Sequence, residues 1–143
     1  MKLMSLVEEH GIPLAVYIAG ANVSEVSLAV PTLATLRIPA GGRGRPQTKV
    51  PYVIADKAYD SDPLRFAFRC RGMELICQNR ANRVTPSLQK KELLGKTKRR
   101  WIVERSFAWY QKFRRLVVRY ETTSSMYLAF VHLACLMITL EQF

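Results

Sequence analysis

Residues 50–77 read VPYVIADKAYDSDPLRFAFRCRGMELIC, and they predict a strand, a helix and a second strand. Residues 50–55 form a short apolar run bounded by turn residues, which predicts a buried strand. Residues 60–63 place acidic and serine caps before a proline, as the start of a helix does. Gly72 fits the end of that helix, and residues 74–77 predict a second strand. Strand, helix and strand in this order are typical of a parallel crossover unit.

The N-terminal part predicts a hairpin followed by helical structure. Residues 2–7 and 12–18 are apolar, β-prone runs on either side of a polar turn that contains Gly11. Ser24 is a candidate helix cap with an apolar helical side after it. Pro31 either interrupts this helix or sits in the first turn of a second one.

The C-terminal half predicts two long helices after a basic loop. Residues 78–98 are polar, basic and punctuated by Pro and Gly, and residues 41–49 form another basic Gly/Pro loop. Residues 99–118 carry one apolar side, whereas residues 124–140 are apolar nearly all round, which predicts a buried helix. We therefore predict one α/β domain, in which helices cover a mixed sheet.

The charge balance favours a polyanionic partner. The chain has 143 residues, with 22 Lys and Arg against 11 Asp and Glu, a net charge of +11. Such a surplus favours nucleic acid, and the chain lacks the clear amphipathic helix that a cationic membrane binder would carry. The apolar stretch 126–140 is shorter than the roughly 20 residues that cross a bilayer. The 3 cysteines, without metal-ligand spacing, fit thiols in a reducing, cytoplasmic setting.

Two carboxylates are candidates for chemistry. Asp56 follows the first crossover strand, where ligand sites of α/β sheets gather, although an aspartate capping a turn is common there. Glu104 falls on the polar side of its helix beside Arg100, and on wheel geometry alone a solvated Glu104–Arg100 pair is the better interpretation. Two carboxylates on so basic a chain fit metal-dependent chemistry on a phosphodiester better than hydrolysis of a neutral sugar.

Basic residues are candidates for phosphate contacts, and the cluster at residues 96–100 is the best of them because it adjoins Glu104. The candidates are Arg43, Arg45, Lys49, Arg80, Arg83, Lys90, Lys91, Lys96, Lys98, Arg99 and Arg114. Trp101 and Trp109 could stack on bases, but their spacing along the helix favours packing in the core.

Two segments resemble the transposases of bacterial insertion sequences. Residues 54–60 (IADKAYD) resemble the block around the second catalytic aspartate of the DDE type, and residues 100–109 (RWIVERSFAW), continuing to 113–116 (FRRL), resemble the block around the glutamate. Residues 2–26 are similar to the hairpin and helix between the two aspartates. The blocks stand in order, about fifty residues apart, and the nearest group is the one typified by insertion sequence five.

The resemblance assigns roles to matching positions. It implies that Asp56 and Glu104 are the second and third metal-binding carboxylates and that Arg100 is the arginine four positions before the glutamate. Many members also have a tyrosine seven positions before the glutamate and a lysine seven positions after it, where this chain has Thr97 and Gln111. The candidates for the lysine's contact with DNA are therefore its neighbours, Lys112, Arg114 and Arg115.

The resemblance also implies a fold and a reaction. The fold would be ribonuclease H-like without its first strand, so that residues 1–143 form a partial catalytic domain with the basic loop 78–98 inside it. The first aspartate would lie upstream of Met1, as in a frameshift product or a broken copy. The reaction would be DNA transposition, a recombination in which a phosphodiester at the element's end is hydrolysed and its strand joined to target DNA.

Cofactor, partners and location follow from the same resemblance. Mg²⁺ or Mn²⁺ would be the cofactor, and double-stranded DNA of the element ends and the target would be the partner, in the cytoplasm at the nucleoid. An upstream transposase segment or a second copy would be a protein partner, and this chain alone would be nearly inactive. A DNA-binding remnant or regulator without catalytic activity, and a standalone nuclease, remain alternatives.

Overall fold

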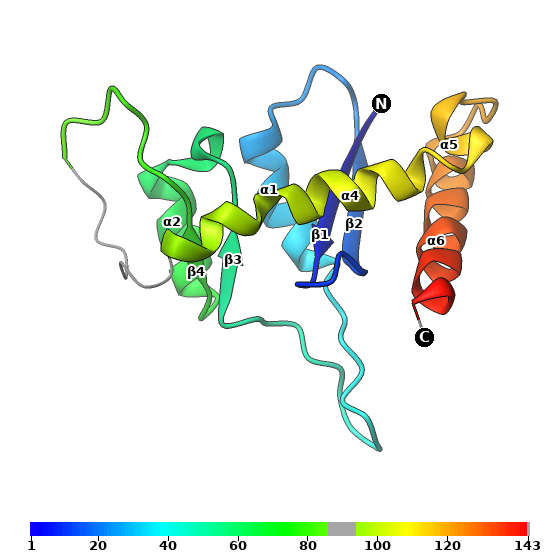
Figure 1. Ribbon diagram of the computed structural model, residues 1–143, viewed down its shortest axis with the longest axis horizontal. Helices are drawn as coiled ribbons and strands as arrows, with labels where there is room; N and C mark the ends of the chain where they lie inside the picture. Colours follow the sequence, from blue (N-terminus) through cyan, green and yellow to red (C-terminus); the bar gives the residue numbers. More distant parts are fainter. Residues whose placement is uncertain (86–93, 143) are drawn as a thin grey trace.

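The computed structural model describes residues 1–85 and 94–142, and it begins with the predicted hairpin (Figure 1). Strands β1 (Lys2–Val7) and β2 (Pro13–Ala19) pair antiparallel, so this prediction is confirmed. Gly11 in the turn has φ +91°, and a Cβ there would lie 2.9 Å from Ser106 Oγ. The turn therefore requires glycine for its backbone conformation and for its close contact with a later helix.

The predicted crossover unit is also confirmed. Strand β3 (Tyr52–Ile54), helix α2 (Asp62–Cys70) and strand β4 (Glu74–Ile76) follow in order, and β3 pairs parallel with β4. A buried cluster holds the unit together: Leu33, Leu64, Phe68, Met73, Leu75 and Cys77. Because β3 is only half-buried, the predicted burial of this strand is only partly met.

The strands form two sheets rather than the single mixed sheet that was predicted. In residues 1–85 and 94–142, β1 pairs with β2 and β3 pairs with β4, and no pairing joins the two sheets. The chain is thus α/β as expected, but its sheet is split. One edge of β1 and one edge of β3 are left without a partner strand in this part of the chain.

Helix α1 (Glu25–Ala34) runs through Pro31, so neither predicted interruption occurs. A proline inside a helix removes one backbone hydrogen bond. Here Leu28, Thr32 and Leu33 on the same helix are buried, and α1 packs on both hairpin strands and on α2. That burial offsets the lost bond.

The first of the two long helices predicted near the C-terminus is divided into three pieces. These are the 3₁₀ helix η2 (Gly95–Arg100), α4 (Trp101–Tyr110) and α5 (Arg114–Val117). Because η2 begins at Gly95, the predicted loop 78–98 is wrong at its end, where the chain is already helical. Phe113 is extended, with φ −91° and ψ 101°, and this breaks the helix. The break directs Phe113 and Leu116 toward α6, where they pack against a buried cluster. Figure 1 shows η2 and α4 crossing in front of both sheets.

Helix α6 (Ser124–Glu141) confirms the second long helix but not its burial on all sides. It packs on β2, α4 and α5 through one side, which is formed by Tyr127, Val131, Ala134 and Ile138. The other side is exposed and carries Met126, Leu133, Leu136, Met137 and Leu140. By length and composition it is the one helix in the described residues that could cross a membrane, with 22% of it buried.

Candidate carboxylate site and its basic surroundings

Asp56 stands two residues after β3, at the start of the 3₁₀ helix η1 (Lys57–Tyr59). Its side chain accepts a hydrogen bond from the Lys57 backbone N–H at 2.6 Å, so the carboxylate caps this turn. The capping interpretation and the functional one therefore apply to the same side chain. With 43% of the side chain exposed, one side of the carboxylate stays open to solvent and ligands.

A buried ionic network lies directly behind this turn, and sequence reasoning missed it. The Asp60 side chain is 1% exposed and accepts from Arg65 Nη2 at 2.9 Å and from Arg83 Nη1 at 2.6 Å. Its second oxygen accepts from the Arg80 backbone N–H at 2.9 Å. Arg65 also donates to the Leu75 carbonyl at 2.9 Å. The network joins the residues after β4 to the start of α2.

The same network supports the turn that carries Asp56. The Arg80 guanidinium donates from Nε to the Lys57 carbonyl at 3.3 Å and from Nη2 to the Ala58 carbonyl at 2.5 Å. These carbonyls belong to η1. Arg80, a predicted phosphate contact, is thus engaged within the protein, and Arg83 is engaged with Asp60 and Asp62.

The network makes the stability of the fold depend on pH. Burial of the Asp60 carboxyl raises its pKa, but the hydrogen bonds from Arg80 and Arg65 and the charge of Arg83 outweigh burial and hold the pKa below its ordinary value. Because the folded-state pKa is the lower one, this stabilisation is present above about pH 4 and is lost as pH falls through the folded-state value. We expect the urea midpoint of unfolding to decrease when the pH is lowered below about 4, and to decrease less in Asp60→Asn. An equal decrease of the midpoint with pH in both proteins would contradict this role of Asp60.

Glu104 lies in the first turn of α4, exposed, as the helical wheel predicted. The two residues after it fasten this helix to the hairpin turn. Arg105 Nη2 donates to the His10 carbonyl at 2.5 Å, and buried Ser106 Oγ donates to the Gly11 carbonyl at 2.6 Å. Among the described residues no hydrogen bond or ion pair engages the Glu104 carboxylate, so it is free to bind a ligand.

Arg100 connects the two carboxylates. Its Nη1 lies 2.6 Å from Asp56 Oδ1, with 49% of the Arg100 side chain exposed. Glu104 follows Arg100 by four residues along the continuous helical stretch of η2 and α4. The predicted Glu104–Arg100 pair is therefore wrong as an ion pair, because Arg100 turns to Asp56. The structure thus pairs Asp56 with Arg100, and Glu104, which is also exposed, follows Arg100 by about one helical turn.

The carboxylates fit a divalent metal ion in kind but not in number. Carboxylate oxygens are the ligands that Mg²⁺ and Mn²⁺ prefer. Within the described ranges, however, no group of three or more His, Cys, Asp or Glu side chains could hold a metal ion. Asp56 and Glu104 therefore do not form a complete metal site on their own.

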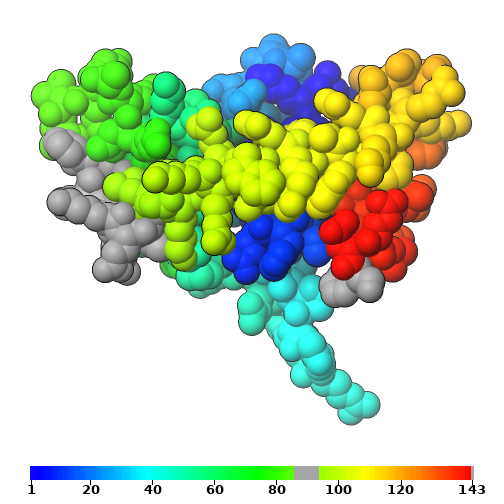
Figure 2. All heavy atoms as spheres, viewed as in Figure 1, coloured from blue at the N-terminus to red at the C-terminus, as the bar shows by residue number. Residues whose placement is uncertain are grey.

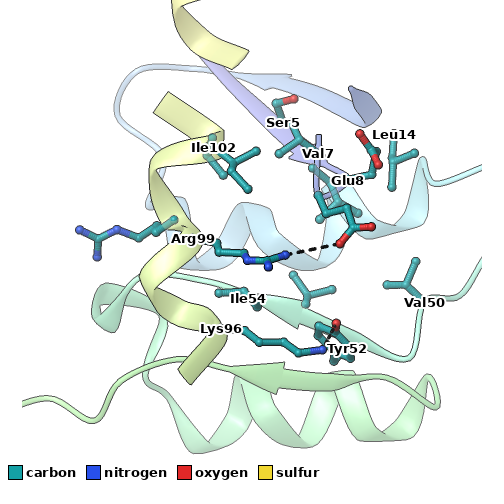
Figure 3. Close-up of a pocket in the computed structure, with 15 residues that line it drawn as sticks. Ser5, Val7, Glu8, Leu14, Val50, Tyr52, Ile54, Lys96, Arg99 and Ile102 are labelled. Carbon is teal, nitrogen blue, oxygen red and sulfur yellow. Dashed lines mark hydrogen bonds and ion pairs between the residues drawn. The ribbon is translucent and has the colours of Figure 1, made fainter. Parts of the chain in front are cut away.

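A cavity of about 490 Å³ separates the two sheets. Three residues of β1 (Ser5, Leu6 and Val7) line one side, and all of β3 lines the other. Figure 3 shows Ser5 and Val7 facing Tyr52 and Ile54 across this space, with η2 and α4 beside it. The edges left without partner strands thus face one another across the cavity.

The predicted phosphate contacts next to this cavity differ in what they touch. Lys96 Nζ donates to Tyr52 Oη at 2.7 Å, and Arg99 Nη1 lies 3.6 Å from Glu9 Oε2. Lys98 is exposed, and no ion pair engages it within the part of the chain that the structure describes. Lys98 is therefore the most available cation of η2.

The other predicted phosphate contacts lie farther along the surface. Arg43, Arg45 and Lys49 are exposed on the loop that projects from the body in Figure 1. Near α5, Lys112 and Arg114 are exposed, while Arg115 Nη1 lies 3.3 Å from Glu121 Oε1. Lys90 and Lys91 lie outside the described residues.

Comparisons with known proteins identify a family for this chain. The family model described as a transposase DDE domain matches residues 1–140. A relative from Burkholderia cepacia, named as a transposase for insertion sequence element IS402, is 36% identical over 92% of this chain, which spans 58% of that relative. A Brucella ovis relative, named as a transposase for element IS6501, is 31% identical over 98% of each chain. No solved structure matches.

Proposed function

The chain belongs to the transposase DDE domain family, and on that premise we propose that it cuts and joins DNA at the ends of an insertion sequence. Its role in transposition follows from its relatives. The observation that supports the chemical proposal is the exposed Asp56–Arg100 pair, with the exposed Glu104 four residues after Arg100 and the cations of η2 before it. The substrate would be a DNA phosphodiester, whose negative charge this surface attracts.

Asp56, Arg100 and Glu104 each have a proposed role. Asp56 and Glu104 would hold Mg²⁺ or Mn²⁺, which, when bound, activates a water and stabilises the leaving oxygen of a phosphodiester. Arg100 keeps the Asp56 side chain oriented through their 2.6 Å contact. Because Arg100 is half-exposed, it can turn toward a phosphate when DNA approaches.

The third carboxylate would come from a strand that enters the cavity between β1 and β3. Two strand edges without partners present backbone donors and acceptors to the same space, and an extended segment pairs with such edges. A strand there would join the two small sheets into one mixed, ribonuclease H-like sheet. The occupant would be a segment of the transposase from outside residues 1–143.

This arrangement predicts that the chain is nearly inactive alone. With two of three carboxylates, the metal ions lack a ligand that fixes their position, and most of the rate enhancement depends on that position. The edges of β1 and β3 would also be exposed until the partner strand binds. Unpaired strand edges are prone to association. Supplying the strand should therefore raise both activity and stability.

A second candidate is a DNA-binding regulator without catalytic activity. The absence of a three-ligand group among the described residues favours it. A regulator would keep its affinity for DNA after Asp56→Ala or Glu104→Ala and would gain no cleavage from the completing strand. The proposed transposase would gain cleavage from the strand and lose it with either substitution.

Binding to duplex DNA should depend on the free cation of η2. We expect Lys98→Ala to weaken binding and to reduce the slope of log K against log salt by about one, because one phosphate contact is lost. Arg37→Ala removes an equal charge from the end of α1, where Arg37 donates to the Ala34 carbonyl at 3.0 Å. The slope is measured by fluorescence anisotropy. An equal change in both variants would show that only net charge matters.

A further inference from the structure

The loop between α1 and β3 projects from the body of the molecule as a narrow arm (Figures 1 and 2). Two backbone hydrogen bonds close its base: the Ile38 N–H donates to the Gln47 carbonyl at 2.9 Å, and the Gln47 N–H donates to the Ile38 carbonyl at 2.8 Å. Residues 39–46, between them, are all exposed. A Cβ added to Gly41 or Gly42 would meet no atom within 4 Å, so the tip has open space around it.

The arm carries two long side chains on an almost bare backbone. Residues 39–46 read PAGGRGRP, in which every residue except Arg43 and Arg45 is Gly, Ala or Pro. Gly41 has φ +72°, a conformation that glycine adopts freely. Within residues 1–85 and 94–142, no hydrogen bond or ion pair engages either guanidinium, and residues 26–55 contain no Asp or Glu. The arm therefore presents two unpaired cations, which favours a polyanionic partner.

The shape of the arm fits the minor groove of duplex DNA better than the major groove. The major groove is about 12 Å wide and admits a whole helix or a two-stranded ribbon, whereas the minor groove is about 6 Å wide. A backbone without bulky side chains fits the narrower groove, and Arg is a side chain that proteins insert there. Contacts with phosphates alone would not require so slim a support, because phosphates lie on the outside of the duplex.

The chemistry of the two guanidinium groups distinguishes between base pairs. A guanidinium has N–H donors and no acceptor. In the minor groove, A·T pairs in both orientations present only acceptors, whereas G·C pairs add the N2 amino group of guanine, which is a donor. A donor facing a donor forms no hydrogen bond. Tracts of A·T pairs also have a narrow minor groove with an enhanced negative potential, which attracts Arg. Both effects favour A·T pairs.

We propose that the arm inserts Arg43 and Arg45 into the minor groove of A·T-rich duplex DNA. The inference rests on the proposed function, because it takes DNA as the partner, and it adds a preference for base composition. The contact uses neither Asp56 nor Glu104 and requires no metal ion. Binding measured in the presence of a chelator therefore tests the arm separately from DNA cleavage.

The test compares three duplexes of equal length, and so of equal charge, whose central pairs are A·T, G·C or hypoxanthine·C. Hypoxanthine is guanine without the N2 amino group, so its pair with cytosine keeps the major-groove acceptors of G·C and loses the minor-groove donor. Fluorescence anisotropy measures the affinity of the 143-residue chain. We expect the A·T duplex to bind about 5-fold or more tightly than the G·C duplex. The hypoxanthine duplex should resemble the A·T duplex; if it resembles the G·C duplex, the proposal is overturned.

Variants of the arm assign the preference to its two arginines. Arg43→Ala with Arg45→Ala should bring the ratio of the A·T and G·C affinities close to one. Arg43→Lys with Arg45→Lys keeps the charge and should preserve G·C binding, but it should lose much of the preference, because an ammonium is more strongly hydrated than a guanidinium. Lys112→Ala with Arg114→Ala removes two exposed cations near α5 and should leave the ratio unchanged.

The outcomes separate the two proposals. Equal affinities of the unchanged chain for A·T and G·C duplexes, or a preference that survives Arg43→Ala with Arg45→Ala, would overturn the role of the arm while the proposed function stands. Circular dichroism of each variant checks that its helices are intact. If the chain binds none of the duplexes even at low salt, both proposals fail.

Discussion

Asp56→Ala and Glu104→Ala are each expected to reduce Mg²⁺-dependent nicking by the assembled transposase at least about a thousandfold. The reason is that each removes a proposed metal ligand, and even residues that only support such ligands cost about 10- to 100-fold when replaced. Nicking is measured on supercoiled DNA that carries the element's end. DNA binding should change little, since the exposed cations remain.

The control for this expectation is another exposed carboxylate. Glu141 ends α6, away from η1, and Glu141→Ala should retain normal nicking. Losing activity in this variant too would indicate a general defect rather than a missing ligand. Retained nicking in Asp56→Ala would place the metal site elsewhere on the chain.

The second large effect concerns stability. Asp60→Ala is expected to lower the free energy of unfolding by about 3 kcal/mol or more, because it leaves the buried Arg65 charge without its carboxylate. Arg65 is 7% exposed at its side chain, so water cannot easily replace the lost partner. Arg83 would also lose one of its two carboxylate partners.

Asp62→Ala provides the matched comparison. Its carboxylate pairs with the same Arg83 but is 74% exposed, and exposed pairs contribute about 0 to 1 kcal/mol. Urea unfolding followed by circular dichroism measures both variants. Equal losses would show that the burial of Asp60 does not matter, which would contradict the account of the network.

Local sequence signals predicted the elements that surround the site. The hairpin and the crossover unit were recognised because their turns contain residues with defined roles, such as Gly11 and Pro63. The wheel placed Glu104 on the exposed side of its helix for the same reason, since helical periodicity is a local property. Proximity of Asp56 and Arg100 across 44 positions needed the fold.

The wrong predictions of burial share a cause. A pattern of apolar residues does not show which other elements pack against a helix. The side of α6 with Leu136 and Leu140 has the composition of a core and yet is exposed, because the described elements cover the other side. In α2, the apolar Phe66 is 69% exposed, while the charged Arg65 is buried where it donates to the Leu75 carbonyl.

The break at Phe113 and the split sheet are equally nonlocal. No Gly or Pro marks the break, so nothing in the sequence predicted it, and it exists because Phe113 packs toward α6. The gap between β1 and β3 could not be predicted from either strand, because the sequence of a strand does not show which strands pair with it. The Asp60 network could not be predicted either, because Arg80 and Arg83 follow Asp60 by 20 and 23 positions in the sequence.

We propose that this chain carries two of three catalytic carboxylates and requires a completing strand between β1 and β3. The most direct test is Mg²⁺-dependent nicking of DNA with the element's end, by the 143-residue chain alone and by the chain fused to the upstream reading frame. We expect nicking only by the fusion, abolished by Asp56→Ala or Glu104→Ala. Nicking by the chain alone, or none by either protein, would contradict the claim.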